Sequence, residues 1–200
     1  EFRRVLFRSE RESRKRNLPP GYRMEVRRVE FRRIAAGVAE QMNWRFDSTE
    51  AEVPCTIEFP GGITVKCRPD RIDRLPDGRC VIVDYKSSKE ETVEKIVRDE
   101  AALQGPLYCL SVRETKEMEP AAMMFFAVRT GEAFGWGAIP GWPGENLRPF
   151  PENWMEEART RSADRLGDYL TGNIRPEPHD PEDCRYCDAR NACRYELQIG

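Results

Sequence analysis

The stretch Arg68–Lys86, RPDRIDRLPDGRCVIVDYK, decides how the rest of the chain is interpreted. It places Asp70 at the end of one predicted strand and follows it with a turn at Asp77-Gly78. The apolar run Cys-Val-Ile-Val then leads into Asp84–Lys86, as in a central strand that is buried on both faces. The stretch therefore predicts a β-hairpin that carries two carboxylates and a lysine at its rim.

These three charged groups are suited to one kind of chemistry. Mg²⁺ prefers oxygen ligands, and we expect Asp70 and Asp84, at neighbouring strand ends, to converge on one ion. A bound metal neutralises charge on a phosphate and lowers the pKa of an attacking water. Lys86 shares a strand face with Asp84, so its ammonium can orient that water, whereas Tyr85 points to the other face and is expected to pack there. The alternative is an exposed hairpin with solvated charges.

The order carboxylate, DG turn, apolar strand and Asp-x-Lys resembles the core motif of the PD-(D/E)XK nuclease superfamily, and particularly of its RecB-like branch. The resemblance implies an α/β fold with a restriction-endonuclease-like core, in which helices flank a central mixed sheet. It also implies that Asp70, Asp84 and Lys86 are catalytic, and that the two aspartates bind Mg²⁺ or Mn²⁺. Asp73, in the same D-R-I-D element, is expected to support Arg71 or the hairpin.

A second pair of residues follows the hairpin. Gln104 and Tyr108 are four residues apart on a predicted helix and therefore share one face. Taken alone they are an ordinary surface pair. Placed after Asp-Tyr-Lys, they resemble the Q-x-x-x-Y motif of RecB-like nucleases, which implies that they border the active site and contact DNA.

The seven cysteines fall into two groups. No secretory signal is visible and the number is odd, which argues against a disulfide framework. Four of them are dispersed in predicted strands and a helix and are expected to be small buried residues: Cys55, Cys67, Cys80 and Cys109. Cys184, Cys187 and Cys193 instead form C-x2-C-x5-C, which indicates a metal or cluster site. Zinc and iron–sulfur both need a fourth ligand, and His179 could complete a zinc site.

The cysteine tail resembles that of AddB-type helicase–nuclease subunits and of Cas-associated RecB-like exonucleases. The resemblance implies a [4Fe–4S] cluster whose fourth cysteine lies far upstream, but no cysteine precedes Cys55. Glu1–Ser9 resembles the translation of a sequencing adapter, and truncation there would have removed that ligand together with an upstream histidine. The alternative is an ordinary basic N-terminal segment. We exclude these nine residues from the fold argument.

The rest of the chain predicts one mixed α/β domain. A helix is expected over Tyr22–Trp44, a hairpin over Glu52–Phe59 and Gly62–Lys66, a helix over Glu90–Val112 that bends or restarts at Gly105-Pro106, strands over Ala121–Arg129 and Phe134–Ile139, and a helix over Trp154–Leu170. We divide the chain into residues 1–9 (the adapter-like start), 10–51 (linker and N-terminal helix), 52–175 (nuclease core) and 176–200 (Cys-rich segment).

The bulk composition limits the function only loosely. A net charge of −2 neither indicates nor excludes nucleic-acid binding, because a cleft needs local positive charge. No apolar run approaches the ~20 residues that span a bilayer, so we expect a cytoplasmic protein.

The resemblance implies a Mg²⁺-dependent DNA exonuclease domain of a RecB/AddB-type helicase–nuclease. It would act on single-stranded ends in double-strand break repair and recombination, with a helicase region or partner subunit. The alternatives are a standalone RecB-like CRISPR-adaptation exonuclease, a non-catalytic DNA-binding clamp and a zinc-ribbon interaction module.

Overall fold

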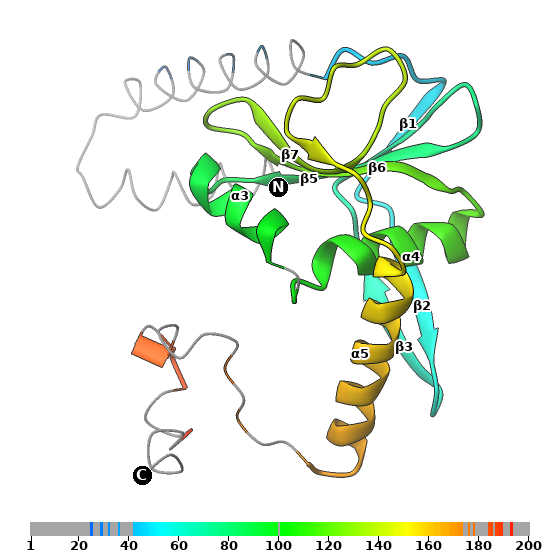
Figure 1. Ribbon diagram of the computed structural model, residues 1–200, viewed down its shortest axis with the longest axis vertical. Coiled ribbons are helices and arrows are strands. Elements are labelled where there is room, and N and C mark those ends of the chain that lie inside the picture. The colour runs from blue at the N-terminus through cyan, green and yellow to red at the C-terminus, as the bar shows by residue number, and fades with distance from the viewer. Residues whose placement is uncertain are drawn as a thin grey trace. The chain divides into compact units, whose positions relative to one another are not determined.

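The computed structural model describes residues 42–99 and 101–173, and a few isolated positions outside these ranges (Figure 1). The chain divides into two compact units, Glu1–Arg159 and Thr160–Gly200. The adapter-like residues Glu1–Ser9 lie outside the described residues. So does most of the helix expected over Tyr22–Trp44. Its described positions Glu25, Val29, Arg32 and Ala36 are helical, whereas its last three residues are not.

A six-stranded mixed sheet forms the centre of the first unit, in the order β1-β4-β5-β6-β7-β8. The central pair β5–β6 is parallel, and antiparallel strands flank it on both sides. Parallel strands need a crossover connection, which α3 and α4 supply. The expected mixed sheet flanked by helices is therefore confirmed. The elements are β1 (Ser48–Ala51), β4 (Arg71–Arg74), β5 (Cys80–Lys86), β6 (Pro120–Ala127), β7 (Glu132–Gly137), β8 (Leu147–Arg148), α3 (Glu90–Arg98) and α4 (Gln104–Lys116).

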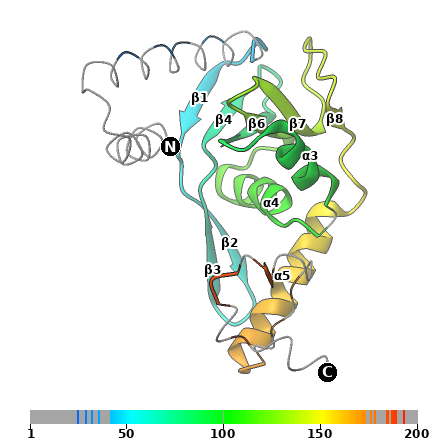
Figure 2. The same ribbon diagram turned by 90° about the vertical axis from the view of Figure 1, so that its left-hand side faces the viewer.

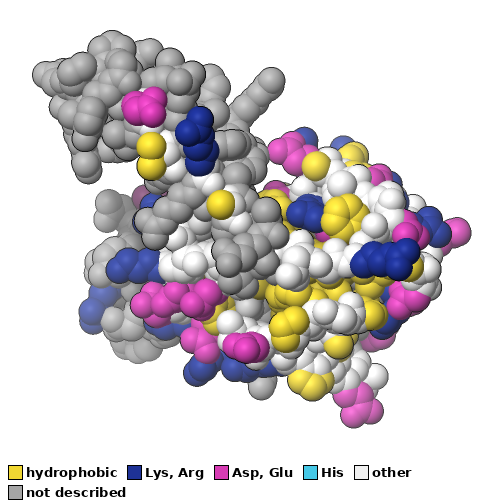
Figure 3. All heavy atoms as spheres, turned by 90° about the horizontal axis from the view of Figure 1, so that it is seen from above, with side chains coloured by type: hydrophobic (Ala, Val, Ile, Leu, Met, Phe, Trp, Pro, Cys, Tyr) yellow, Lys and Arg dark blue, Asp and Glu magenta, His cyan; other side chains and the backbone are white. Residues whose placement is uncertain are grey.

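The sheet buries both of its faces. On one face α3 and α4 pack against β6, and α3 also contacts β7, as Figure 2 shows. The other face carries Val83 and Phe126, over which Met42, Trp44 and Ile139 pack. Figure 3 views the molecule from the side of this second face, where apolar side chains gather with charged side chains around them. Because both faces are covered, β5 and β6 are almost continuously apolar, as their sequence predicts.

A separate hairpin of β2 (Cys55–Phe59) and β3 (Ile63–Cys67) packs against α4. Its turn contains Gly61 at φ 82° and Gly62 at φ 74°, a backbone conformation that glycine adopts without strain. The hairpin expected from the Pro-Gly-Gly signal is confirmed.

The helix expected over Glu90–Val112 restarts, as the sequence allowed. Helix α3 ends at Arg98 and α4 begins at Gln104, so Pro106 lies in the first turn of α4, where no helical hydrogen bond is lost. Gly105 is required for packing, since a Cβ there would lie 2.9 Å from the ring of Trp136. Helix α5 (Trp154–Leu170) has the bounds expected from the sequence. In the described part of the chain, no helix combines the length and apolar character needed to cross a membrane.

Candidate active site

The register of the sheet brings Asp70 beside Asp84. In the antiparallel pair β4–β5, Arg71 faces Val83, and the same register continued by one residue sets Asp70 opposite Asp84. The backbone N–H of Tyr85 donates a 2.7 Å hydrogen bond to Oδ2 of Asp70, which fixes that carboxylate. Asp70 lies directly before β4 rather than at the end of a strand, so that detail of the prediction was wrong. The two carboxylates are still neighbours, because the start of β4 meets the end of β5.

Helix α4 completes the site with the two residues expected from it. Lys86 Nζ lies 2.7 Å from Asp84 Oδ2 and donates a 2.8 Å hydrogen bond to Gln104 Oε1. The amide nitrogen of Gln104 in turn donates to Asp84 Oδ1 at 3.0 Å and to the hydroxyl of Tyr108 at 3.1 Å. Asp84, Lys86 and Gln104 therefore form a closed ring of polar contacts, and Tyr108 extends it. Four residues predicted separately from two motifs meet at one place.

The lysine of this ring of polar contacts also packs against the sheet. Lys86 Nζ lies 5.0 Å from the centre of the buried Phe125 ring, within the range of a cation–π contact. This contact and the two polar partners hold the ammonium in one position, and a lysine held in this way loses little further freedom when it acts on a substrate.

Burial controls the protonation of this site. Only 5% of Asp84 is exposed, and burial raises the pKa of its carboxyl, which the hydrogen bond from Lys86 opposes and the charge of Asp70 reinforces. Burial also raises the pKa of Tyr108 to about 12, so Tyr108 is a neutral phenol at pH 7. With both aspartates ionised and one lysine, the local charge is −2 + 1 = −1. A cation would offset this charge.

The donors present fit Mg²⁺ or Mn²⁺. Both ions prefer carboxylate oxygens and complete their shells with water, so two aspartates suffice. Three of the four carboxylate oxygens already accept one polar contact, and each keeps lone-pair capacity for a second partner. No cluster of three or more acidic, cysteine or histidine side chains suited to a metal ion occurs among the described residues. A metal at this site would therefore depend on Asp70 and Asp84 together with water.

Two further predictions concern the opposite face of the sheet, and both are confirmed. Tyr85 packs there, its ring edge-on to Phe126 with ring centres 6.0 Å apart. Asp73, which is fully buried, accepts two hydrogen bonds of 2.7 Å from Arg71. It also accepts a 2.9 Å hydrogen bond from the indole of Trp44, a partner that sequence reasoning missed. No local pattern links Trp44 to a residue 29 positions later.

The cysteines differ in burial between the folded core and the tail. The four predicted to be buried are buried free thiols in β2, β3, β5 and α4: Cys55, Cys67, Cys80 and Cys109. In the tail, Cys184 and Cys193 are partly buried and Cys187 is exposed. The described positions of this segment do not gather three ligands at one point. No step of the chemistry is therefore derived through a cluster.

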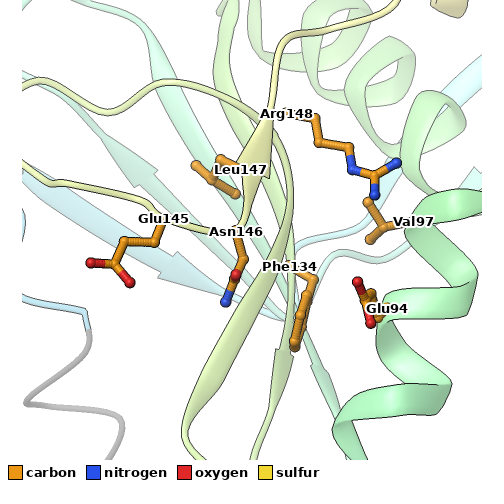
Figure 4. A pocket seen from close by; sticks show the side chains of 7 residues that line it. All are labelled: Glu94, Val97, Phe134, Glu145, Asn146, Leu147 and Arg148. Carbon is orange, nitrogen blue, oxygen red and sulfur yellow. The ribbon is translucent and has the colours of Figure 1, made fainter.

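One hollow on the surface of the first unit lies away from the candidate residues. It measures about 170 Å³ and lies between α3 and β8, as Figure 4 shows. It is lined by Glu94, Val97, Phe134, Glu145, Asn146, Leu147 and Arg148. None of the residues predicted to be catalytic or to contact DNA lines it, so it is separate from the candidate site.

Comparison with known proteins adds to this geometry. A family model described as the PD-(D/E)XK nuclease superfamily matches residues 1–194. The chain belongs to this superfamily. Members of the superfamily are nucleases that use Mg²⁺ or Mn²⁺, and the mixed α/β core described above is consistent with their restriction-endonuclease-like fold. DNA is the substrate that this membership implies.

Fifteen chains of solved structures also match. One of them, titled "Crystal structure of SSO0001", is 16% identical, with a TM-score of 0.46 over 96% of this chain and 80% of the other. No curated protein matches the chain. These comparisons do not separate the RecB-like branch from the rest of the superfamily.

Proposed function

We propose that this chain is a Mg²⁺-dependent DNA exonuclease domain that acts on single-stranded ends. One observation supports this function above the others. Asp84, Lys86 and Gln104 form a closed ring of contacts of 2.7 to 3.0 Å beside Asp70. An exposed hairpin with solvated charges does not account for a buried aspartate and a lysine that is held from two sides.

Each residue has a distinct part in the proposed mechanism. Asp70 and Asp84 would hold the metal, which when bound would neutralise charge on the phosphate and lower the pKa of water. Lys86 donates hydrogen bonds to the water and to the phosphate oxygen on which charge develops. Gln104 keeps the lysine in place through its side-chain oxygen and Asp84 through its side-chain nitrogen.

Tyr108 has a different part. As a neutral phenol it keeps a donor hydrogen, and together with Gln104 it guides the DNA strand past the site. Tyr108 contacts both Gln104 and Asp84, but Lys86 and Asp84 contact each other directly, so loss of Tyr108 leaves the contact between Lys86 and Asp84 intact. We therefore expect it to affect strand binding more than the chemical step.

The biological setting is the finer part of the proposal. The Q-x-x-x-Y pair after Asp-Tyr-Lys and the cysteine tail favour a RecB/AddB-type helicase–nuclease that works in double-strand break repair with a helicase region or partner subunit. The tail cysteines Cys184, Cys187 and Cys193 would then bind a [4Fe–4S] cluster. Brown protein that contains iron and acid-labile sulfide supports this proposal, whereas colourless protein that contains zinc supports the interaction-module alternative.

The test of activity uses end-labelled single-stranded DNA with Mg²⁺, with Mn²⁺ or with EDTA. We expect cleavage with either metal, none with EDTA, and loss of cleavage in Asp84→Ala and Lys86→Ala. A protein that binds the strand and cuts nothing with either metal would instead be the non-catalytic clamp. Folding of each variant is checked by circular dichroism, so that loss of activity is not loss of structure.

A further inference from the structure

Two exposed cations without acidic partners lie in the loops that leave β5 and β6, next to the candidate site. In the first unit, eight of the described basic side chains are ion-paired, namely Arg68, Arg71, Arg79, Lys86, Arg98, Arg113, Lys116 and Arg159. Lys89 and Arg129 are exposed, and neither forms an ion pair with any described residue. An exposed cation without a carboxylate beside it keeps its full charge for a ligand.

Both residues lie at the carboxyl ends of the two parallel strands. Lys89 follows Lys86, the last residue of β5, by three positions, and Arg129 follows Ala127, the last residue of β6, by two. Lys86 faces Ala127 in the register, and the N–H of Val128 donates a 3.0 Å hydrogen bond to the carbonyl of Lys86. Three residues span at most about 11 Å, so the Cα atoms of both residues lie within that distance of the backbone of Lys86 or of its partner strand.

The position matters because ligands of α/β proteins bind outside the carboxyl ends of parallel strands. A polynucleotide that approaches this edge meets a site of local charge −1, which repels phosphates until a metal binds. The chain as a whole also has a net charge of −2 and attracts no anion from a distance. Local cations must therefore supply the attraction, and Lys89 and Arg129 are the unpaired ones in the two loops that leave β5 and β6.

We propose that Lys89 and Arg129 bind backbone phosphates of the DNA strand on either side of the phosphate that Asp70, Asp84 and Lys86 act on. The inference rests on the proposed function and deepens it, since it names where the strand is held. Phosphate contacts position a strand without reading its sequence. The site should therefore bind strands of different sequence equally well.

The test measures binding of a fluorescent 20-nucleotide oligothymidylate at several NaCl concentrations, with Ca²⁺ in place of Mg²⁺ to suppress cleavage. The variants are Lys89→Gln, Arg129→Gln and the double variant. The matched control is Arg74→Gln, because Arg74 is exposed, forms no ion pair within the described residues and faces Cys80 at the opposite end of β5. All three substituted residues are exposed, so the urea midpoint of unfolding should not move.

Each phosphate contact to a single strand contributes about 0.7 to the slope of log K against log salt concentration. We expect the slope to fall by about 0.7 in each single variant and by about 1.4 in the double variant, with weaker binding in each, while Arg74→Gln binds like the wild type. Wild-type affinity and slope in the double variant, or an equal loss in Arg74→Gln, overturn the inference. If the wild type cuts DNA in that case, the proposed function stands; if it neither cuts nor binds DNA, both proposals fail.

Discussion

The buried contact between Arg71 and Asp73 gives the sharpest test of how the fold is held together. The two side chains are 19% and 0% exposed, and both carboxylate oxygens of Asp73 accept from Arg71 at 2.7 Å. Replacing Asp73 by Asn keeps the size of the side chain and removes its charge. The guanidinium of Arg71, which lies 5.8 Å from the centre of the Trp44 ring, then stays half-buried without a counter-charge.

Removing one partner of a buried ion pair costs about 3–5 kcal/mol of unfolding free energy. Arg71 keeps some contact with water and with the aromatic rings beside it, so we expect a loss near the lower end, about 3 kcal/mol. With a urea m-value of about 2 kcal/mol/M, the midpoint of unfolding falls by about 1.5 M. Urea titration followed by tryptophan fluorescence measures this shift, since Trp44 donates a hydrogen bond to Asp73.

The chain contains a matched control for this measurement. Asp77 and Arg79 form the same kind of pair two residues apart, with an N–O distance of 2.7 Å, but their side chains are 43% and 44% exposed. Exposed pairs contribute little because water and salt screen them. We expect Asp77→Asn to leave the midpoint unchanged. A shift in Asp73→Asn as small as that in Asp77→Asn would refute the argument that burial makes the first pair important.

Two further predictions concern packing and thiol reactivity. Gly135→Ala should destabilise the protein by about 1–3 kcal/mol, because a Cβ there would lie 2.1 Å from the carbonyl oxygen of Met123. Gly167→Ala in α5 should instead stabilise the protein by about 0.5–1 kcal/mol, because a Cβ there meets nothing within 4 Å. Thermal unfolding of the two variants measures both effects, and equal behaviour would contradict the packing argument. Burial raises the pKa of Cys80 from 9.0 to about 12, so iodoacetamide at pH 8 should modify it about a thousandfold more slowly in the folded than in the unfolded protein. Mass spectrometry of the peptides measures the rate of modification, and the exposed Cys187 of metal-free protein is the internal comparison. Equal rates of modification at Cys80 and Cys187 would contradict this prediction.

The elements with a clear pattern could be predicted from the sequence. The apolar run of β5, the turn between β2 and β3, and the helix α5 all appear where they were expected. Strand β1 lies ahead of the boundary drawn at residue 52. All four of its residues are exposed, so it lacks the alternation of apolar and polar residues that marks a strand. Its pairing with β4 is a tertiary contact that local sequence does not encode.

The residues of the candidate site also divide into those that the sequence could predict and those that it could not. Asp84, Lys86, Gln104 and Tyr108 were recognisable from the resemblance to nuclease motifs, and the structure brings them together. The position of Asp70 directly before β4, and the hydrogen bond that it accepts from the backbone of Tyr85, depend on the register between two strands. Register is set by the sheet as a whole, so a motif does not specify it.

The most direct test of the central claim compares two aspartates that lie seven residues apart in one stretch. Asp70→Asn removes a charge from the proposed metal site, and Asp77→Asn removes the same charge from the exposed turn. The measurement is the rate of Mg²⁺-dependent cleavage of end-labelled single-stranded DNA under single-turnover conditions. We predict a loss of at least about 100-fold for Asp70→Asn and a wild-type rate for Asp77→Asn. Equal rates in the two variants would contradict the assignment of this site as the nuclease active centre.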